Sequence, residues 1–285
     1  MIMAVASGKG GTGKTTVAVN LALVAQSREG IQFLDTDVEE PNAHLFLKPD
    51  FHCSETVGLP VPQIDQEKCT CCGKCAEICA FNALAVLGET VLTFPELCHG
   101  CGGCSYFCPE KAIIEVSREI GVLEKGLVGQ MVYLHGRLRV GETMAPPLIE
   151  AVKEKVNKKG ITIIDVPPGT SCPAVSAVRG SDYCLLVTEP TPFGLHDLQL
   201  SVEMLRKLKI PFGVVINRAD MGDEGVEDYC QAEDIPILMK IPWDEEVARL
   251  YSRGQVAVNH SLAWKKRFAE LWNIINLEQK EKDVI

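Results

Sequence analysis

Eight of the 13 cysteines in this sequence fall into two short runs that share one spacing. In each run the cysteines follow the pattern C-x2-C-x2-C-x3-C, and each cysteine of the second run lies 29 residues after its counterpart in the first. The two runs are Cys69, Cys72, Cys75 and Cys79, followed by Cys98, Cys101, Cys104 and Cys108. This repeat predicts a duplicated half-module whose thiolates bind iron–sulfur clusters.

The spacing within one run places three thiolates on a tight loop, so the fourth ligand of a cubane cluster must come from elsewhere. With Pro109 after the second run, the pattern resembles a bacterial two-cluster ferredoxin over residues 63–118. Ala80 stands in place of the family's proline after the first run, so the sequence does not predict the conformation of the turn at this position. The resemblance implies two 4Fe-4S clusters with exchanged fourth ligands. One cluster would be bound by Cys69, Cys72, Cys75 and Cys108, and the other by Cys98, Cys101, Cys104 and Cys79.

Structural zinc and disulfides are the alternatives for these cysteines. Four-cysteine zinc sites also use C-x2-C pairs, but as two separated pairs and not as two tandem quartets. Disulfides need an oxidising compartment, and the stretch Met1–Ser7 before the first glycine is too short for a secretory signal. The sequence therefore favours iron–sulfur clusters and a cytoplasmic location.

The composition predicts one large core and a small second module. The chain has 285 residues, 46% of them hydrophobic, and a formal net charge of −10. Two oxidised clusters, each of about −2, would lower this charge to roughly −14, which disfavours nucleic acid as a partner. No apolar run in the sequence approaches the roughly 18 residues that a membrane-spanning helix needs.

A phosphate-binding loop follows the first predicted strand. Residues 2–6 are typical of a buried parallel strand, residues 8–15 match the motif G-x4-G-K-[ST], and residues 17–25 are typical of a helix. In this context the loop amides and the lysine bind phosphates, and the threonine after the lysine binds Mg²⁺. The residues that we expect to contact ATP or Mg²⁺ are Gly8, Gly10, Gly11, Thr12, Gly13, Lys14, Thr15 and Thr16.

The loop also resembles that of one family. The string K-G-G-T-G-K-T-T, which begins at Lys9, resembles the deviant Walker motif of the MinD, ParA, Mrp and nitrogenase iron protein family. In that family the first lysine crosses a dimer interface to the partner's nucleotide. The resemblance implies that Lys9 stabilises transition-state charge in trans, and that the chain forms an ATP-dependent dimer with itself or with a paralogous chain.

Several residues at predicted strand ends match functional positions of the same family. The resemblance implies that Asp37, in Asp35-Thr36-Asp37, orients the attacking water. Asp165 follows the apolar run 161–164 and is expected to hold Mg²⁺ through water. Alternatively, either aspartate only caps the segment after it. The positions expected to contact the base and ribose are Asn217, Pro242 and Asp244.

Apolar runs alternate with helical stretches along the rest of the chain. This alternation predicts an α/β fold with a doubly wound, mostly parallel sheet of the P-loop NTPase type, interrupted by a small α+β ferredoxin-like domain. The expected domains are residues 1–62 and 119–285 for the ATPase and 63–118 for the insert, with Pro60 and Pro62 marking its entry. The predicted strands are residues 2–6, 31–34, 161–164, 183–188, 212–216 and 237–241, and the predicted helices include 17–25, 195–208 and 245–252.

Together the motifs predict an ATPase whose ATP-driven closure controls electron transfer from two 4Fe-4S clusters to an unidentified acceptor. The alternative is assembly or transfer of iron–sulfur clusters or metallocofactors. A redox or metallocofactor protein is the expected partner in both cases. Carriers of the Mrp type share a cluster through a C-x2-C pair, and no such pair exists among the remaining cysteines, which are Cys53, Cys71, Cys172, Cys184 and Cys230.

Two further hypotheses concern the second half of the chain. Cys172 lies seven residues after Asp165, the offset of a cluster ligand in the nitrogenase iron protein. We nevertheless expect Cys172 to be a buried structural thiol and not a ligand of a third cluster. A helical stripe would suit the interfacial helix of a positioning ATPase, but we expect it to pack on the sheet, with no membrane partner. The stripe consists of Trp264, Phe268, Leu271 and Ile275.

Overall fold

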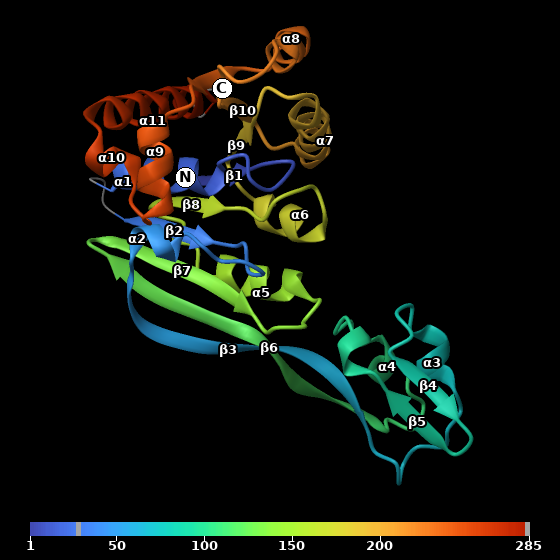
Figure 1. Ribbon diagram of the computed structural model, residues 1–285. Coiled ribbons are helices and arrows are strands. Elements are labelled where there is room, and N and C mark those ends of the chain that lie inside the picture. The colour runs from blue at the N-terminus through green and yellow to red at the C-terminus, as the bar shows by residue number, and fades with distance from the viewer. Residues whose placement is uncertain (27–29, 283–285) are drawn as a thin grey trace.

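The computed structural model describes residues 1–26 and 30–282 and is built around one large mixed sheet (Figure 1). Within the described residues the sheet has nine strands. All neighbouring pairs are parallel except the last two, which form an antiparallel edge. In spatial order the strands are β11 (Ile237–Ile241), β10 (Phe212–Asn217), β9 (Tyr183–Thr188), β1 (Ile2–Ala6), β8 (Ile161–Asp165), β2 (Ile31–Asp35), β7 (Met131–Leu138), β6 (Ile113–Val128) and β3 (Asp50–Ile64).

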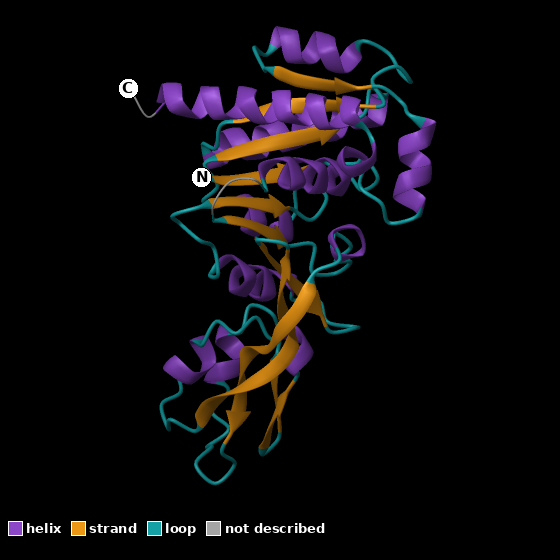
Figure 2. Cartoon of the chain, turned by 90° about the vertical axis from the view of Figure 1, so that its left-hand side faces the viewer, coloured by secondary structure: helices purple, strands orange, loops and turns teal. Residues whose placement is uncertain are grey.

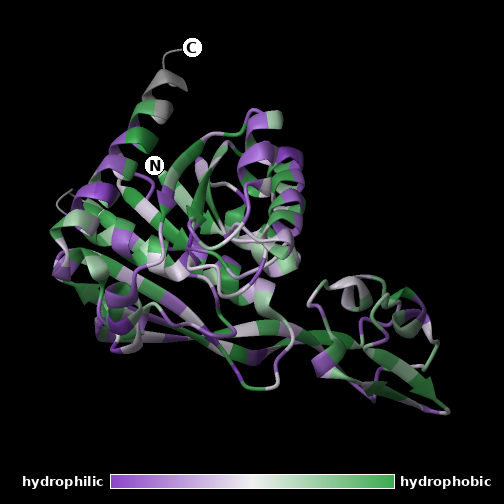
Figure 3. Cartoon of the chain, turned by 45° about the horizontal axis from the view of Figure 1, so that its top comes forward, coloured by the Kyte–Doolittle hydropathy of each residue, from purple (hydrophilic) through white to green (hydrophobic). Residues whose placement is uncertain are grey.

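Helices cover both faces of this sheet (Figure 2). Each face buries its own apolar cluster, and the central strands are hydrophobic while the outer helix surfaces carry hydrophilic residues (Figure 3). One face holds α5 (Ala145–Lys153), α6 (Cys172–Val178), α7 (Pro192–Leu208) and α8 (Gly225–Ala232). The other holds α1 (Lys14–Ala25), α2 (His44–Leu47), α9 (Glu245–Ser252), α10 (Ala257–His260) and α11 (Leu262–Lys282). This arrangement confirms the doubly wound, mostly parallel α/β fold.

The predicted strands all form, and three of them end one residue later than expected. β2, β8 and β10 include the polar residues Asp35, Asp165 and Asn217. Asp35 is paired with Asp165 in the register of β2 and β8, so neighbouring strands hold these polar ends in place. The first helix begins at Lys14, three residues before the start predicted from apolar periodicity.

The C-terminal stripe lies in α11 and packs on the sheet. The Trp264, Phe268, Leu271 and Ile275 side chains are at most 6% exposed and belong to the same apolar cluster as α1. The prediction of core packing is therefore confirmed, and the stripe does not form an interfacial face. No helix in the described ranges is both long and apolar enough to cross a membrane.

A two-stranded arm extends from the antiparallel edge of the sheet (Figure 1). Gly121 of β6 pairs with Leu138, the last residue of β7, so residues 113–120 run past the sheet with their β3 partners. Since β7 is parallel to β2, the arm leaves on the side where the P-loop lies.

Pro60 and Pro62, which were expected to mark the entry to the insert, do not interrupt the secondary structure. Both lie inside β3, which is an edge strand, where the missing N–H of proline need not remove a ladder hydrogen bond. β3 and β6 also run without a break through residues 62–63 and 118–119. The domain boundaries at these positions therefore remain a prediction.

The arm carries a small second unit. It contains α3 (Lys74–Ile78), β4 (Leu84–Leu87), β5 (Thr90–Thr93), a 3₁₀ turn at Pro95–Leu97 and α4 (Gly103–Tyr106). The 29-residue sequence repeat is visible in its backbone. Gly73 and Gly102 precede α3 and α4 with φ of 82° and 71°, values that favour glycine. The unit has its own apolar cluster, to which several of the cysteines contribute.

Candidate functional site

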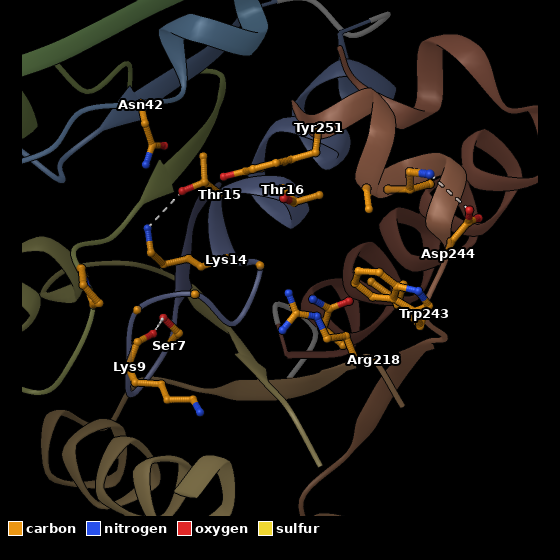
Figure 4. Close-up of a pocket in the computed structure, with 18 of the residues that line it drawn as sticks. Ser7, Lys9, Lys14, Thr15, Thr16, Asn42, Arg218, Trp243, Asp244 and Tyr251 are labelled. Carbon is orange, nitrogen blue, oxygen red and sulfur yellow. Dashed lines mark hydrogen bonds between the residues drawn. The ribbon is translucent and has the colours of Figure 1, made fainter. Parts of the chain in front are cut away.

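A cavity of about 490 Å³ opens above the loop between β1 and α1 (Figure 4). A Cβ added at Gly10 or Gly11 would meet no described atom within 4 Å, so both backbones face open space. Gly13 adopts a φ of 94°, which favours glycine. Of the residues predicted from sequence, those that line the cavity are Lys9, Gly10, Gly11, Gly13, Lys14, Thr15, Thr16, Asp37, Asn217, Pro242 and Asp244. The loop thus leaves room for a phosphate chain at the start of a helix.

Three predicted residues lie outside the lining. Gly8 packs under α7, where a Cβ would come 2.3 Å from the Asp197 carbonyl oxygen. Thr12 is 2% exposed, and its hydroxyl has no hydrogen-bond partner among the described residues. Asp165 lies behind Lys14 and is fully buried.

Lys14 and Asp165 form a buried ion pair at the floor of the cavity. The Lys14 Nζ lies 2.6 Å from Asp165 Oδ1, with side-chain exposures of 7% and 0%. Burial lowers the pKa of Lys14, but the charge and hydrogen bond of Asp165, together with the charges of Asp37 and Asp35, outweigh burial and raise this pKa overall. The second oxygen of Asp165, Oδ2, has no hydrogen-bond partner within the described chain. A buried carboxylate oxygen without a partner is suited to a hydrated cation, so the donor set fits Mg²⁺.

The two aspartates after β2 have different roles. Asp35 is fully buried and accepts hydrogen bonds from the backbone N–H groups of Asp37, Asn42 and Ala43, at 3.0–3.1 Å. It therefore organises the loop after β2. Asp37 instead lines the cavity, and burial raises its pKa to about 6 even though Lys14 opposes the shift. The geometry favours Asp37 over Asp35 as the carboxylate that faces a ligand.

The far end of the cavity contains residues that the sequence motifs did not single out. The Arg218 guanidinium lies 5.4 Å from the centre of the Trp243 ring, in a cation–π contact, while Tyr251 lines the cavity on the side of Thr15 and Thr16 (Figure 4). Arg218 directly follows β10, and Trp243 lies between Pro242 and Asp244 just after β11. Their position at the carboxyl ends of strands was the sequence signal that could have identified them as site residues. Flat aromatic and guanidinium surfaces are suited to stacking with a base.

Asn217 and Asp244 make hydrogen bonds within the protein. The Asn217 side-chain amide donates to the Thr12 carbonyl at 2.8 Å, which ties β10 to the phosphate loop. Asp244 caps α9 through the N–H groups of Glu246 and Val247, and its other oxygen accepts from the Trp264 indole at 3.2 Å. The Asp244 carboxylate thus shapes the wall of the cavity and is already engaged on both oxygens.

Lys9 is held within its own chain. Its Nζ lies 3.6 Å from Glu189 Oε2, and the other oxygen of Glu189 accepts from Arg218 at 2.6 Å. The Glu189 side chain is 10% exposed, whereas that of Lys9 is 32% exposed. One nearly buried carboxylate therefore links Lys9 of the glycine loop to Arg218 at the other end of the cavity.

The cysteine runs meet in two hollows of the small unit. One hollow is lined by Cys69, Cys72, Cys75 and Cys108, with Cys71 beside them. The other is lined by Cys98, Cys101, Cys104 and Cys79. Each hollow thus combines three cysteines of one run with the last cysteine of the other run. Among residues 1–26 and 30–282, no three Cys, His, Asp or Glu side chains converge on a point suited to a single metal ion.

Backbone amides donate to the last cysteine of each run. The Ala83 N–H donates to Cys79 Sγ and the Ala112 N–H to Cys108 Sγ, both at 3.3 Å, and the two contacts are related by the 29-residue repeat. Donors of this kind stabilise a thiolate. Burial raises the pKa of the Cys104 thiol to about 11, so a bound cation must displace its proton.

The remaining cysteines are spread over the chain. Cys184 and Cys230 are buried, Cys53 is exposed and Cys71 is intermediate. Cys172 is exposed, so the prediction of a buried structural thiol at this position is wrong. The reason is that Cys172 is the first residue of α6, which begins beyond the carboxyl end of β8 and outside the packed sheet.

Comparison with known proteins identifies the nucleotide-binding part. Residues 3–258 match the model of the CobQ/CobB/MinD/ParA nucleotide binding domain. The chain belongs to this family. As a P-loop ATPase, it has the fold of MinD from Pyrococcus horikoshii, solved with Mg-ADP, with a TM-score of 0.61, 20% identity and coverage of 96% and 95% of the two chains.

The sequence matches to related proteins cover most of this chain and most of each relative. An uncharacterized protein of Methanocaldococcus jannaschii is 34% identical over 253 residues, which are 88% of this chain and 87% of that protein. A protein of Pyrococcus horikoshii named iron-sulfur cluster carrier protein is 26% identical over 266 residues, or 85% of this chain and 74% of that protein.

Proposed function

We propose that this ATPase binds two 4Fe-4S clusters in its small unit and uses ATP and Mg²⁺ to handle them. The observation that carries the proposal is the pair of hollows, each lined by three thiolates of one run and one of the other. Each thiolate of a cubane binds a different iron, so the ligands surround a cluster without meeting at one point. By this interpretation, residues 63–118 form a ferredoxin-like insert between ATPase segments 1–62 and 119–285.

For the nucleotide, the glycine loop and Lys14 are proposed to bind the phosphates, and Thr15 with Asp165 to hold Mg²⁺. The metal would supply charge neutralisation at the phosphates. Asp37 faces the same cavity with a pKa of about 6, so it is mostly ionised at neutral pH and able to accept a hydrogen bond from water. Asn217, Arg218 and Trp243 are proposed to contact the base.

We further propose an ATP-dependent dimer in which Lys9 acts on the partner's nucleotide. Lys9 is the more exposed member of its pair with Glu189, and its side chain has to leave that carboxylate to reach another chain. The Lys9–Glu189 contact is long, at 3.6 Å, and Arg218 still pairs with Glu189 when Lys9 leaves, so nucleotide-driven association can replace this contact. Dimer formation and release of Lys9 from Glu189 would therefore be coupled.

A mixing experiment tests the trans role of Lys9. Lys9→Ala alone is expected to lower ATP hydrolysis by about 10³-fold with little loss of ATP binding, as for a trans-acting arginine finger. Lys14→Ala is inactive for a different reason, since its own nucleotide site is defective. Mixing the two variants should restore part of the activity, because Lys9 of the Lys14→Ala chain completes the site of the Lys9→Ala chain. No recovery on mixing, or wild-type turnover by Lys9→Ala, would contradict the trans role.

Assembly or delivery of iron–sulfur clusters or metallocofactors is the function that we place first. The relative named iron-sulfur cluster carrier protein supports it. The sequence alone had placed electron transfer first. Electron transfer stays the second candidate because each ligand set is complete within the insert and one cysteine of each set is protected by an amide donor, as is typical of resident clusters. Tyr106 and Phe107, between Cys104 and Cys108 of the second run, are 83% and 55% exposed, so a protein partner can dock there.

One anaerobic experiment separates the two candidates. The full-length protein, reduced with dithionite and desalted, is mixed with apo-ferredoxin or with oxidised methyl viologen, in the presence or absence of MgATP. MgATP-dependent appearance of iron in ferredoxin supports assembly. MgATP-dependent reduction of the dye without loss of iron supports electron transfer. A colourless preparation with little iron or sulfide would refute the proposal that the chain binds clusters.

A further inference from the structure

Arg118 lies where the arm joins the body. It is on β6, opposite Leu59 of β3, and its side chain is 15% exposed. Leu59 in turn touches the second cysteine run, since a Cβ at Gly100 would lie only 2.8 Å from Leu59 Cδ1. Arg118 is thus a partly buried cation between the ATPase body and the loop that holds Cys98 and Cys101.

Only one end of the Arg118 guanidinium is paired. Nη1 donates to Glu142 Oε2, while Nε and Nη2 are buried and find no hydrogen-bond partner in the described structure. A buried donor without a partner is costly, and a guanidinium offers its donors in a fixed planar fork. The free N–H groups therefore point to an acceptor that the protein chain does not itself provide.

The surroundings of Arg118 are negatively charged on the side of the second run. The pKa of Arg118 is raised by the hydrogen bond to Glu142 and then by the charges of Glu142, Glu96 and Cys98. Cys98 is 8% exposed and lines the hollow that also contains Cys79, Cys101 and Cys104. Arg118 does not itself line this hollow, but a cluster there would add a charge of about −2 on the Cys98 side of the guanidinium.

We propose that Arg118 positions and tunes the cluster held by Cys98, Cys101, Cys104 and Cys79, by directing its free N–H groups and its charge towards that cluster. This inference rests on the proposed function. Reduction adds one electron and makes the cluster more negative, so a fixed cation beside it favours the reduced form and raises the reduction potential. Residues 63–118 contain no other arginine, and the cation that lines the hollow of the first run is Lys74.

Glu142 ties the same guanidinium to the ATPase body. The Glu142 side chain is 3% exposed, and its second oxygen accepts from the N–H groups of Thr143 and Met144, directly before α5. α5 packs on α6, which follows the Asp165–Thr170 segment of the nucleotide site. Arg118 is therefore held in place by a residue of the body and not by the insert.

The test is a redox titration of the full-length protein, followed by electron paramagnetic resonance, with iron and sulfide counted in every sample. Arg118→Met removes the charge at similar length, Arg118→Lys keeps it, and Arg139→Met removes an exposed arginine of the body as a matched control. Arg118→Met is expected to disfavour reduction of one cluster by about tenfold, which is a shift of about 59 mV for one electron. The other cluster, Arg118→Lys and Arg139→Met should remain close to wild type.

Each outcome decides the inference. Loss of about four irons in Arg118→Met, with Arg118→Lys still loaded, would support a positioning role at one cluster. Unchanged potentials in a fully loaded Arg118→Met protein would overturn the inference, and so would equal shifts in Arg118→Met and Arg139→Met. If wild-type protein contains no clusters, the proposed function itself fails, which is distinct from a cluster that is present but indifferent to Arg118.

Discussion

Replacing Lys14 with alanine is expected to abolish ATP hydrolysis. Among the described residues, Lys14 is the one cation that forms an ion pair with Asp165 on the floor of the cavity, with 2.6 Å between Lys14 Nζ and Asp165 Oδ1. It is also the P-loop lysine expected to bind the phosphates. Loss of a single group that stabilises transition-state charge costs about 10²–10³ in rate, so phosphate release should fall by at least that factor. Steady-state ATPase activity at saturating MgATP measures the effect.

The same substitution is expected to destabilise the protein, so folding must be separated from catalysis. Removing Lys14 leaves Asp165 as a fully buried carboxylate without its partner, a change that typically costs about 3–5 kcal/mol. The double variant Lys14→Ala/Asp165→Asn removes the unpaired charge and should regain much of this stability, as measured by thermal unfolding. It should remain inactive. ATP hydrolysis by the folded double variant at the wild-type rate would contradict the proposed roles of Lys14 and Asp165 in hydrolysis.

Removing one exchanged cysteine is expected to remove one entire cluster. Cys79→Ala takes away the fourth ligand of the hollow that contains Cys98, Cys101 and Cys104. We expect about four of about eight irons to be lost, because an exposed cubane with three protein ligands is readily lost. Anaerobic iron and sulfide analysis of the purified protein measures the result, with Cys53→Ala as a control outside both hollows.

Two double variants show whether the ligands are exchanged between the runs. If Cys79 serves the second run, then Cys79→Ala/Cys104→Ala damages one cluster twice and still retains about four irons. By contrast, Cys79→Ala/Cys75→Ala damages both clusters and retains close to none. The opposite pattern, with iron kept only by the second double variant, would mean that each run binds its own cluster. It would contradict the arrangement of the two hollows.

Local sequence patterns predicted most of the body of this protein. The strands at residues 183–188 and 237–241 form over the predicted residues, and the stripe that contains Trp264 and Phe268 is buried. Short apolar runs and helical periodicity depend on neighbours in sequence, which is why they were visible. The arm was not predicted, since residues 50–64 contain exposed polar residues and two prolines, and they become a strand only by pairing with β6.

In the nucleotide site, the motifs identified the residues of the loop but not how they are held. Asp35 and Asp37 are two residues apart in one motif, yet one supports the loop through backbone N–H groups while the other faces the cavity. Glu189, Arg218 and Trp243 belong to no motif and were missed as members of the site. Cys172 was misplaced because its exposure depends on where α6 begins relative to the sheet.

The sequence by itself determined the chemistry that this chain can offer: a glycine loop with two lysines and two cysteine quartets repeated every 29 residues. Such motifs are local, and their geometry follows from residues a few positions apart. Only the tertiary structure decided which distant groups meet, such as Lys14 with Asp165, Asn217 with Thr12 and Arg118 with Glu142. The physical reason is that strand order in the sheet differs from chain order, so these contacts arise from packing and have no signature in sequence spacing.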